Sequence, residues 1–183
     1  MKKVCVFLAD GFEEIEGLTV VDILRRAGVE TETVSVMGRK QIHGSHDILV
    51  EADKLFEEAD IAAADMLVLP GGMPGTLNLK AHEALKGQLL AFDSQGKYLA
   101  AICAAPTVLS ELGLLKGKKA CAYPSFEDQL DCGEVLRVPT VTDGNITTGR
   151  GMGAAIPFAL KLTAILCGEE KAEEVKASIV YEG

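Results

Sequence analysis

Apolar and polar positions alternate along the chain in two patterns. Short runs of aliphatic and β-branched residues, typical of buried strands, are separated by longer stretches in which apolar residues recur at helical spacing. The first pattern predicts strands over residues 3–8, 32–36, 66–69, 98–102, 119–122 and 145–148. The second predicts helices over residues 15–26, 81–95, 105–112, 154–166 and 169–177. This alternation predicts βαβ units around a mostly parallel sheet.

Two segments interrupt the alternation. Residues 38–53, GRKQIHGSHDILVEAD, predict a short antiparallel hairpin, because Gly44 and Ser45 separate two extended stretches. A second antiparallel segment is expected around residues 135–143. No internal repeat, low-complexity segment or linker divides the chain, so a single domain is expected over residues 1–183.

The composition limits the classes of function. The chain has 183 residues, 48% hydrophobic and 25% charged, which is typical of a globular protein with a sizeable core. A formal net charge of −9 leaves no basic surface for a phosphate backbone, so nucleic acid is not expected as a partner. The apolar runs are too short to span a membrane, and the apolar start of the chain ends at Asp10, unlike a signal peptide. A cytoplasmic location is expected.

Five cysteines are scattered along the chain. They include no C-x-x-C pair that would bind a metal or exchange disulfides, and they are Cys5, Cys103, Cys121, Cys132 and Cys167. Reduced thiols are therefore expected. The chain shows no metal-binding motif and no glycine-lysine phosphate loop, so neither a metal nor a cofactor is predicted.

Cys103 lies where a strand is expected to end. Ligands of open α/β sheets bind beyond the carboxyl ends of the strands. The strand YLAAI leads directly into Cys103 and a helix, which is the arrangement of a nucleophile elbow without its G-x-S-x-G signature. The backbone N–H of Ala104 would favour a thiolate there. A cysteine flanked by alanines is also typical of a protein core, and the residue pattern leaves both interpretations open.

A second strand end carries two adjacent glycines. Gly71 and Gly72, in VLPGGMPG, would let backbone N–H groups face a ligand without a Cβ in the way. The N–H groups of Gly72 and Ala104 could then form an oxyanion hole over Cys103. A glycine turn without chemistry is the alternative interpretation.

A third strand end supplies acidic residues. Glu13, Glu14 and Glu16 open a helix, where carboxylates are favoured by the helix dipole and are usually solvated. Because Ile15 is expected to face the core, the three carboxylates cannot all point into one cleft. A glutamate beside a thiolate would have a raised pKa and would donate a hydrogen bond as a neutral acid. The residue pattern does not select one of the three.

The three histidines are expected at the surface. His43 and His46 lie on the predicted hairpin, and His82 lies at the start of a helix. None of them neighbours Cys103 in the sequence, so the pattern does not favour cysteine-histidine hydrolase chemistry. An amidase that uses the same elbow is the least favoured function.

Five segments together identify a family. The chain resembles the DJ-one/YajL branch of the ThiJ/PfpI superfamily in the order and spacing of LADGFEEIEGLTVVDILRRAG, DMLVLPGGMPG, AAICAAPTVL, TTGRGMGAAIPFALKLTAIL and KAEEVKAS. The resemblance implies a flavodoxin-like three-layer αβα sandwich, of the class I glutamine amidotransferase type. The sheet would be mostly parallel with a small antiparallel hairpin. It also implies a homodimer.

The resemblance also implies roles for individual residues. Cys103 would be a nucleophile of low pKa, and Glu16 a protonated acid beside its sulfur. Gly72 and Ala104 would donate the oxyanion hydrogen bonds. The other pocket positions implied are Gly71, Glu13 as a second acidic position, and Gly151.

Four positions depart from patterns within the superfamily. Tyr123 stands where human-type members carry a pocket histidine, so a histidine proton shuttle is not expected. His46 replaces the arginine of many members. Met152 replaces a proline that would approach the pocket from the dimer partner. Ala104 replaces the histidine of the protease-like PfpI branch, which argues against a peptidase.

Two functions would use the same activated thiol. The first is a cofactor-independent glyoxalase or deglycase, in which Cys103 adds to a 2-oxoaldehyde, or to its early adduct on a protein, and Glu16 moves a proton. The second is a redox sensor or redox-gated chaperone, in which peroxide oxidises Cys103 to a sulfinate. The expected partners are therefore a small aldehyde or a glycated protein, together with a second copy of the chain.

Overall fold

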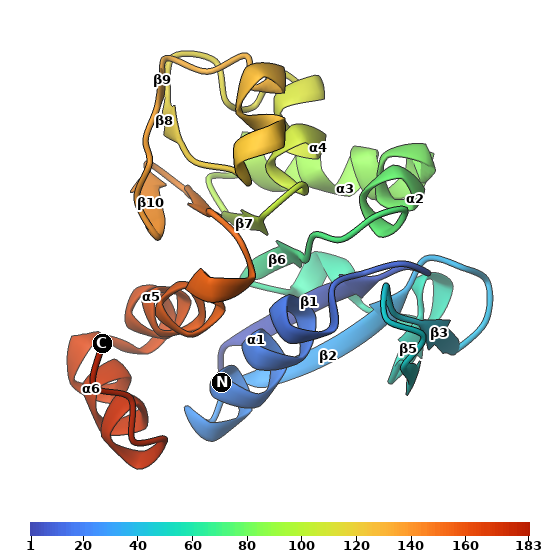
Figure 1. Ribbon diagram of the computed structural model, residues 1–183. Coiled ribbons are helices and arrows are strands. Elements are labelled where there is room, and N and C mark those ends of the chain that lie inside the picture. Colours follow the sequence, from blue (N-terminus) through green and yellow to red (C-terminus); the bar gives the residue numbers. More distant parts are fainter.

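The computed structural model describes residues 1–183, and a seven-stranded sheet forms its centre (Figure 1). In order across the sheet the strands are β10 (Thr140–Asp143), β11 (Ile146–Gly149), β7 (Tyr98–Ile102), β6 (Met66–Leu69), β1 (Lys3–Leu8), β2 (Glu30–Ser35) and β5 (Lys54–Leu55). All neighbouring strands are parallel except β10 and β11. The predicted mostly parallel α/β fold is confirmed.

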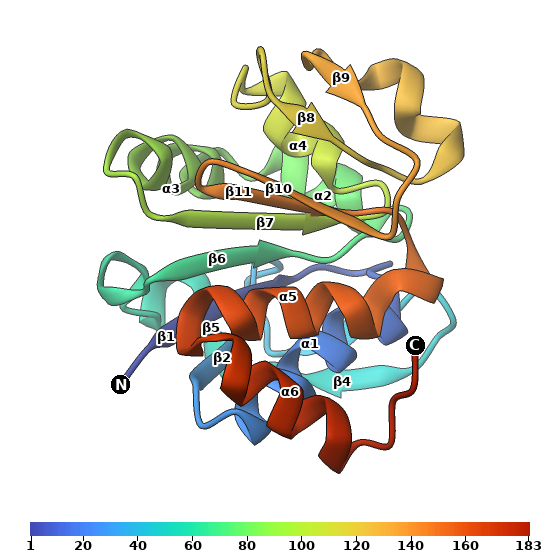
Figure 2. The same cartoon turned by 90° about the vertical axis from the view of Figure 1, so that its left-hand side faces the viewer.

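Helices cover both faces of this sheet (Figure 2). One layer contains α1 (Glu14–Arg26), α5 (Ala155–Cys167) and α6 (Glu169–Ser178), and the other contains α2 (Gly75–Ala81), α3 (Glu83–Ser94) and α4 (Pro106–Glu111). Along β1, Val4 and Val6 pack in the core beneath α1 and α5, whereas Cys5 and Phe7 pack in the opposite core. Successive strand side chains point to opposite faces, so an uninterrupted apolar strand fills both cores.

The central strands agree closely with the sequence prediction, and one strand does not. Residues 3–8, 66–69 and 98–102 are β1, β6 and β7, and the predictions for β2 and β11 are within two residues of their bounds. The predicted strand over residues 119–122 is wrong in extent. Only β8 (Lys119–Ala120) forms, and it pairs with β9 (Glu134–Val135) in a separate two-stranded sheet. Beyond it, the N–H of Cys121 donates to the Thr148 hydroxyl at 2.9 Å instead of to a strand.

The predicted hairpin is confirmed, with β3 (Gln41–His43) antiparallel to β4 (Leu49–Glu51). Its backbone is fastened beside the end of β1, because the N–H of Gly11 donates to the His43 carbonyl at 2.7 Å and that of Ser45 to Phe12 at 2.8 Å. The second antiparallel segment, expected around residues 135–143, is confirmed only for β10, since β9 is parallel to β8.

The helix predicted over residues 81–95 corresponds to α3, which begins two residues later than predicted. A separate helix, α2, precedes it. His82 lies between the two, and its Nδ1 accepts the N–H of Leu85 at 3.1 Å, capping α3. The ring of His82 also lies 4.5 Å from that of Phe56, between centroids, and the residue is half-buried. The expectation of an exposed His82 is therefore wrong, because the cap and the aromatic contact hold it against the protein.

Helix α1 buries a different face from the one expected. Ile15 is 49% exposed, whereas Glu16 is fully buried, along with Gly17 and Val20. The prediction that Ile15 faces the core is wrong, because the glutamate points inward at the end of β1 and turns the isoleucine outward. None of the helices combines the length and apolarity that crossing a bilayer requires.

Candidate active site

Cys103 occupies the corner between β7 and α4. Its φ of +67° lies in the left-handed region, which residues other than glycine seldom adopt. Two backbone hydrogen bonds hold this conformation: the N–H of Cys103 donates to the Gly149 carbonyl at 2.9 Å, and its carbonyl accepts the N–H of Tyr123 at 2.9 Å. Strain that is held by surrounding structure is typical of functional sites. The corner is thus an elbow, and its cysteine is half-buried rather than sealed in the core.

The loop after β6 closes over this corner. The backbone N–H groups of Gly72 and Ala104 both face the sulfur of Cys103, where each favours the thiolate and lowers the pKa of the thiol. A Cβ on Gly71 would lie 2.6 Å from the Cys103 Cβ and 2.6 Å from Glu16 Oε2, so only glycine fits there. The structure therefore brings together the two donors and the glycine pair that the sequence placed at separate strand ends.

Glu16 lies beside the sulfur and is buried. Its Oε2 accepts the N–H of Gly71 at 2.9 Å, whereas its Oε1 is buried without a hydrogen-bond partner. Burial raises the pKa of Glu16 to about 7, and the Cys103 thiol and the Gly71 N–H offset only part of that rise. A carboxyl group with this pKa exchanges its proton readily near neutral pH.

The thiol has a raised pKa, in contrast to the low pKa that the resemblance implied. Burial and the Glu16 carboxylate raise the pKa of Cys103 to about 12, against the opposing effect of the N–H groups of Ala104 and Gly72. Two adjacent buried anions repel each other, so the pair strongly retains at least one proton. The thiol consequently needs a base at the moment of reaction, and Glu16 is the base that lies next to it.

Glu14 and Glu13 form a second acidic group with the hairpin. Glu14 is buried, although a carboxylate at the start of a helix is usually solvated. Its oxygens accept the backbone N–H of His46 at 2.8 Å and the Ser45 hydroxyl at 3.1 Å, and its Oε2 lies 3.0 Å from His46 Nδ1. Glu13 is half-buried, its carboxylate accepts the Ser45 hydroxyl at 3.2 Å, and its N–H donates to Gly71.

Hydrogen bonding decides the ionisation of Glu14. Burial alone would raise its pKa, but hydrogen bonds from its own backbone, from His46 and from Ser45 outweigh burial and lower the pKa to about 2. The pKa of His46 is raised in turn by its hydrogen bond to Glu14 and by the charges of both glutamates. His46 is exposed, as expected, and is an ion-pair partner of the acidic residues rather than a neighbour of the sulfur.

The same three residues form the one grouping in the chain with the spacing of metal ligands. Ligand atoms of Glu13, Glu14 and His46 lie within 4.8 Å of one another. Carboxylate oxygens and an imidazole nitrogen are suitable ligands for zinc. Their mutual hydrogen bonds and the bonds to Ser45 already account for this arrangement.

Tyr123, Gly151 and Met152 lie on the other side of the elbow. The Tyr123 ring covers Gly151, where an added Cβ would lie 3.2 Å from a ring carbon, and both Tyr123 and Met152 are 48% exposed. Together with Arg150 they line a pocket. Two residues here were not predicted from the sequence: Gly149, whose carbonyl accepts the N–H of Cys103, and Arg150. An arginine directly after a strand, in TTGRGMG, was the available signal.

The fold and the site define a class of α/β sandwich. In it, a cysteine occupies the corner between a central parallel strand and a helix, with two backbone donors and a buried glutamate around its sulfur. Residues 2–165 match the DJ-1/PfpI family, and the chain belongs to that family.

Relatives and solved structures agree with this assignment. The chain is 31% identical to the Schizosaccharomyces pombe protein named glutathione-independent glyoxalase DJ-1, and the match covers 98% of both proteins. It is 37% identical to Arabidopsis thaliana Protein DJ-1 homolog A over 98% of this chain, but it spans only 46% of that longer protein. The structure of oxidized Toxoplasma gondii DJ-1 superimposes with a TM-score of 0.96 at 38% identity, over 100% of both chains.

Proposed function

We propose that the chain is a cofactor-independent glyoxalase that converts 2-oxoaldehydes to 2-hydroxy acids, and that it acts in the same way on early aldehyde adducts of proteins. The observation that carries the proposal is the contact between the Cys103 thiol and Glu16, whose pKa is about 7. The conversion of a 2-oxoaldehyde to a 2-hydroxy acid requires a nucleophile and an adjacent base, and this pair supplies both. The glyoxalase name of the Schizosaccharomyces pombe relative supports it.

In the first step, the sulfur of Cys103 forms a bond to the aldehyde carbon while the thiol proton passes to Glu16. Glu16 then gives this proton to the former carbonyl oxygen, which completes the hemithioacetal and leaves Glu16 ionised. The N–H groups of Gly72 and Ala104, which face the sulfur, would stabilise the developing negative charge on the adjacent oxygen. The thiol does not have to be ionised before the substrate binds, because Glu16 removes its proton as the carbon–sulfur bond forms.

In the second step, Glu16 moves a proton between the two substrate carbons. Ionised Glu16 takes the hydrogen of the hemithioacetal carbon and returns a proton to the adjacent ketone carbon, through an enediol. The first carbon is thereby oxidised to a thioester and the second is reduced to an alcohol, so no external oxidant or reductant is required. Water then cleaves the thioester, which releases the 2-hydroxy acid and restores the Cys103 thiol.

A redox role for the same thiol has one observation in its favour. Glu16 Oε1 is buried without a hydrogen-bond partner beside the sulfur, and a protonated oxygen there would donate to a sulfinate oxygen. The raised pKa of Cys103 slows the thiolate-dependent reaction with peroxide, so we rank this role second. A sensor would consume its oxidant once, whereas an enzyme forms product continuously.

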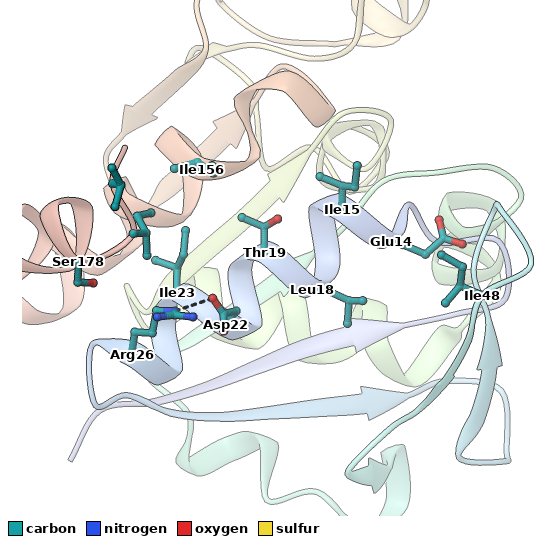
Figure 3. Close-up of a pocket in the computed structure, with 12 residues that line it drawn as sticks. Glu14, Ile15, Leu18, Thr19, Asp22, Ile23, Arg26, Ile48, Ile156 and Ser178 are labelled. Atoms are coloured by element: carbon teal, nitrogen blue, oxygen red, sulfur yellow. Dashed lines mark hydrogen bonds and ion pairs between the residues drawn. The ribbon is translucent and has the colours of Figure 1, made fainter. Parts of the chain in front are cut away.

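We further propose that the protein works as a homodimer in the cytoplasm. Ile15, Leu18 and Ile48 are exposed and, with Ile156, line a groove that also contains Asp22 and Arg26 (Figure 3). Large exposed apolar side chains that gather in one groove with a polar rim are typical of protein interfaces. All five cysteines are free thiols, which fits a reducing compartment. Sedimentation of the wild type and of Ile15→Asp tests the dimer, which the added charge should dissociate.

Turnover of methylglyoxal to lactate tests the enzymatic proposal. Cys103→Ser should lower the rate by more than about a thousandfold, because the hydroxyl is a far weaker nucleophile and the covalent step is lost. Cys167→Ser is the matched control, since that thiol is exposed and remote from the site, and it should retain the wild-type rate. Full turnover by a folded Cys103→Ser protein would contradict the assignment.

A further inference from the structure

A second recognition element adjoins the elbow. The pocket beyond Tyr123 has a cavity volume of about 470 Å³ and lies between the turn after β11 and the segment that precedes β10. Its position relative to the nucleophile follows from the backbone, because Tyr123 and Gly149 are both hydrogen-bonded to Cys103, and Arg150 and Gly151 follow Gly149 directly. A substrate bound at the elbow can therefore extend into this pocket.

The charge of the pocket is opposite to that of the molecule. The chain carries a formal net charge of −9, yet the pocket is lined by two arginines, Arg137 and Arg150, and by no acidic residue. The rest of the lining is apolar or aromatic, including Val138, Pro139 and Tyr181. Such a lining favours a molecule that has a short apolar stem and a negatively charged end.

The two arginines are incompletely paired. Glu127 lies beneath them with its side chain only 10% exposed, and it contacts Arg137 Nε at 3.2 Å and Arg150 Nη2 at 3.5 Å. The second distance is at the limit of a hydrogen bond, and Arg150 Nε is buried without any partner. One carboxylate cannot neutralise two guanidinium groups, so the pocket retains a net positive charge and unused donors.

We propose that this pocket binds an oxyanionic group, a carboxylate or a phosphate, at the far end of the substrate whose aldehyde reacts with Cys103. The inference rests on the proposed glyoxalase function and specifies its substrate class as anionic 2-oxoaldehydes. Arg150 and Arg137 supply the charge and the hydrogen-bond donors, and the apolar lining accommodates the connecting carbons. Guanidinium groups match the geometry of carboxylate and phosphate oxygens.

Two aldehydes of equal chain length test the preference. 4,5-Dioxopentanoate carries a terminal carboxylate, and 2-oxopentanal is its neutral counterpart. The wild type should favour the anionic aldehyde in kcat/KM by about tenfold or more, the effect of a hydrogen bond to a charged group. Arg150→Gln should remove most of this preference and Arg137→Gln part of it.

A control variant separates local from general charge effects. Lys171→Gln removes one positive charge from α6, outside the pocket, where the side chain is 37% exposed, as is that of Arg150. It should leave the preference unchanged. A wild-type enzyme without the preference, or an Arg150→Gln variant that keeps it, would overturn the inference.

A binding measurement distinguishes failure of this inference from failure of the proposed function. Isothermal titration of 2-hydroxyglutarate and of glycerol 3-phosphate into Cys103→Ser requires no turnover and separates carboxylate from phosphate recognition. Binding of either that is lost on adding Arg150→Gln supports the pocket, even if no aldehyde is converted and the glyoxalase proposal fails. Absence of binding for both ligands would reject the anion pocket while leaving the glyoxalase proposal open to its own test.

Discussion

Glu14 and Glu16 lie two residues apart on one helix, and both are buried, yet their surroundings drive their ionisation in opposite directions. The pKa of Glu14 is about 2 and that of Glu16 is about 7. Glu14 receives hydrogen bonds from His46 and Ser45, on a hairpin that folds back against α1. Glu16 receives one backbone N–H, from Gly71, and otherwise faces a thiol and leaves one oxygen unpaired.

This contrast shows that burial alone does not set the chemistry of a carboxyl group. Desolvation raises the pKa of both residues, and the number of donors that face each one decides the outcome. Glu14 is a permanently ionised anchor between the helix and the hairpin. Glu16, with a pKa of about 7, is partly protonated near neutral pH, which suits a group that both accepts and donates a proton.

The largest expected effect concerns turnover. Glu16→Gln should lower kcat for methylglyoxal by about 10²- to 10⁴-fold, because the amide can neither accept the thiol proton nor move the substrate proton. Glu14→Gln, a change of the same kind two residues away, should retain activity within about threefold, since Glu14 does not touch the sulfur. Steady-state kinetics of the two variants checks this. Equal losses in both would remove the functional distinction between the two carboxyl groups.

The next effect is on the pH dependence of stability, and it has opposite signs for the two residues. The folded protein raises the pKa of Glu16 from 4.5 to about 7, so it binds this proton more tightly than the unfolded chain. Stability therefore falls as the pH rises from 4.5 to about 7, by up to about 3 kcal/mol. Glu16→Gln should abolish this decline, as measured by urea denaturation across the window.

For Glu14 the folded protein lowers the pKa from 4.5 to about 2, so the stabilisation is present above 4.5 and is lost as the pH falls toward 2. The expected loss is about 1 to 2 kcal/mol, because the partner His46 is exposed and solvent weakens the interaction. Glu14→Gln should be less stable than the wild type at neutral pH and should approach it in acid. A variant whose deficit stayed constant with pH would contradict the assigned pKa.

Each of the two carboxyl groups also lies against a glycine, Gly71 beside Glu16 and Gly44 beside Glu14, so adding a methyl group at each glycine tests how tightly the two regions are packed. An alanine at Gly71 would place its Cβ 2.6 Å from both Cys103 and Glu16 and 2.8 Å from a backbone oxygen of Ile102. Gly71→Ala should cost about 2 to 3 kcal/mol and disturb turnover, because these neighbours are rigid. Thermal unfolding and kinetics together measure both effects.

At Gly44 the three atoms nearest to an added Cβ all belong to the Glu14 side chain, with Oε1 at 2.1 Å. Gly44→Ala should cost about 1 to 2 kcal/mol, because Glu14 can shift only by weakening its hydrogen bonds to His46 and Ser45, and still less than Gly71→Ala, where the added Cβ also meets backbone. The activity should persist. A larger loss of stability at Gly44 than at Gly71 would show that the hairpin, not the elbow, is the more tightly packed region.

The smallest expected effect is a change in one pKa. His46→Ala removes the imidazole from Glu14 but keeps the backbone N–H that also binds it, so the pKa of Glu14 should rise without reaching its usual value. Carbon-detected NMR titration of the carboxyl groups measures this rise directly. The pKa of Glu16 should stay unchanged in the same spectra, since no hydrogen bond joins it to His46.

Much of the fold could be predicted from local pattern. The strands β1, β6 and β7 are apolar on both faces, and a continuous run of such residues has few alternatives to a central strand. The corner at Cys103 followed from its place between one such strand and a helix. The hairpin followed from Gly44 and Ser45 between two extended stretches.

The electrostatics of the site could not be predicted, because its decisive contacts come from distant segments. The partner of Glu16 is 55 residues away and that of Glu14 is 32 residues away. The outward turn of Ile15, the cap that His82 makes on α3 and the arginine-lined pocket depend in the same way on packing between elements. The sequence by itself determined the sheet, through periodicity, and placed Cys103 between a strand and a helix, but its residue pattern left open whether that cysteine belongs to the core or to a site. Only the tertiary structure decided which glutamate holds a proton, since a pKa reflects every donor and charge that folding brings within hydrogen-bond reach.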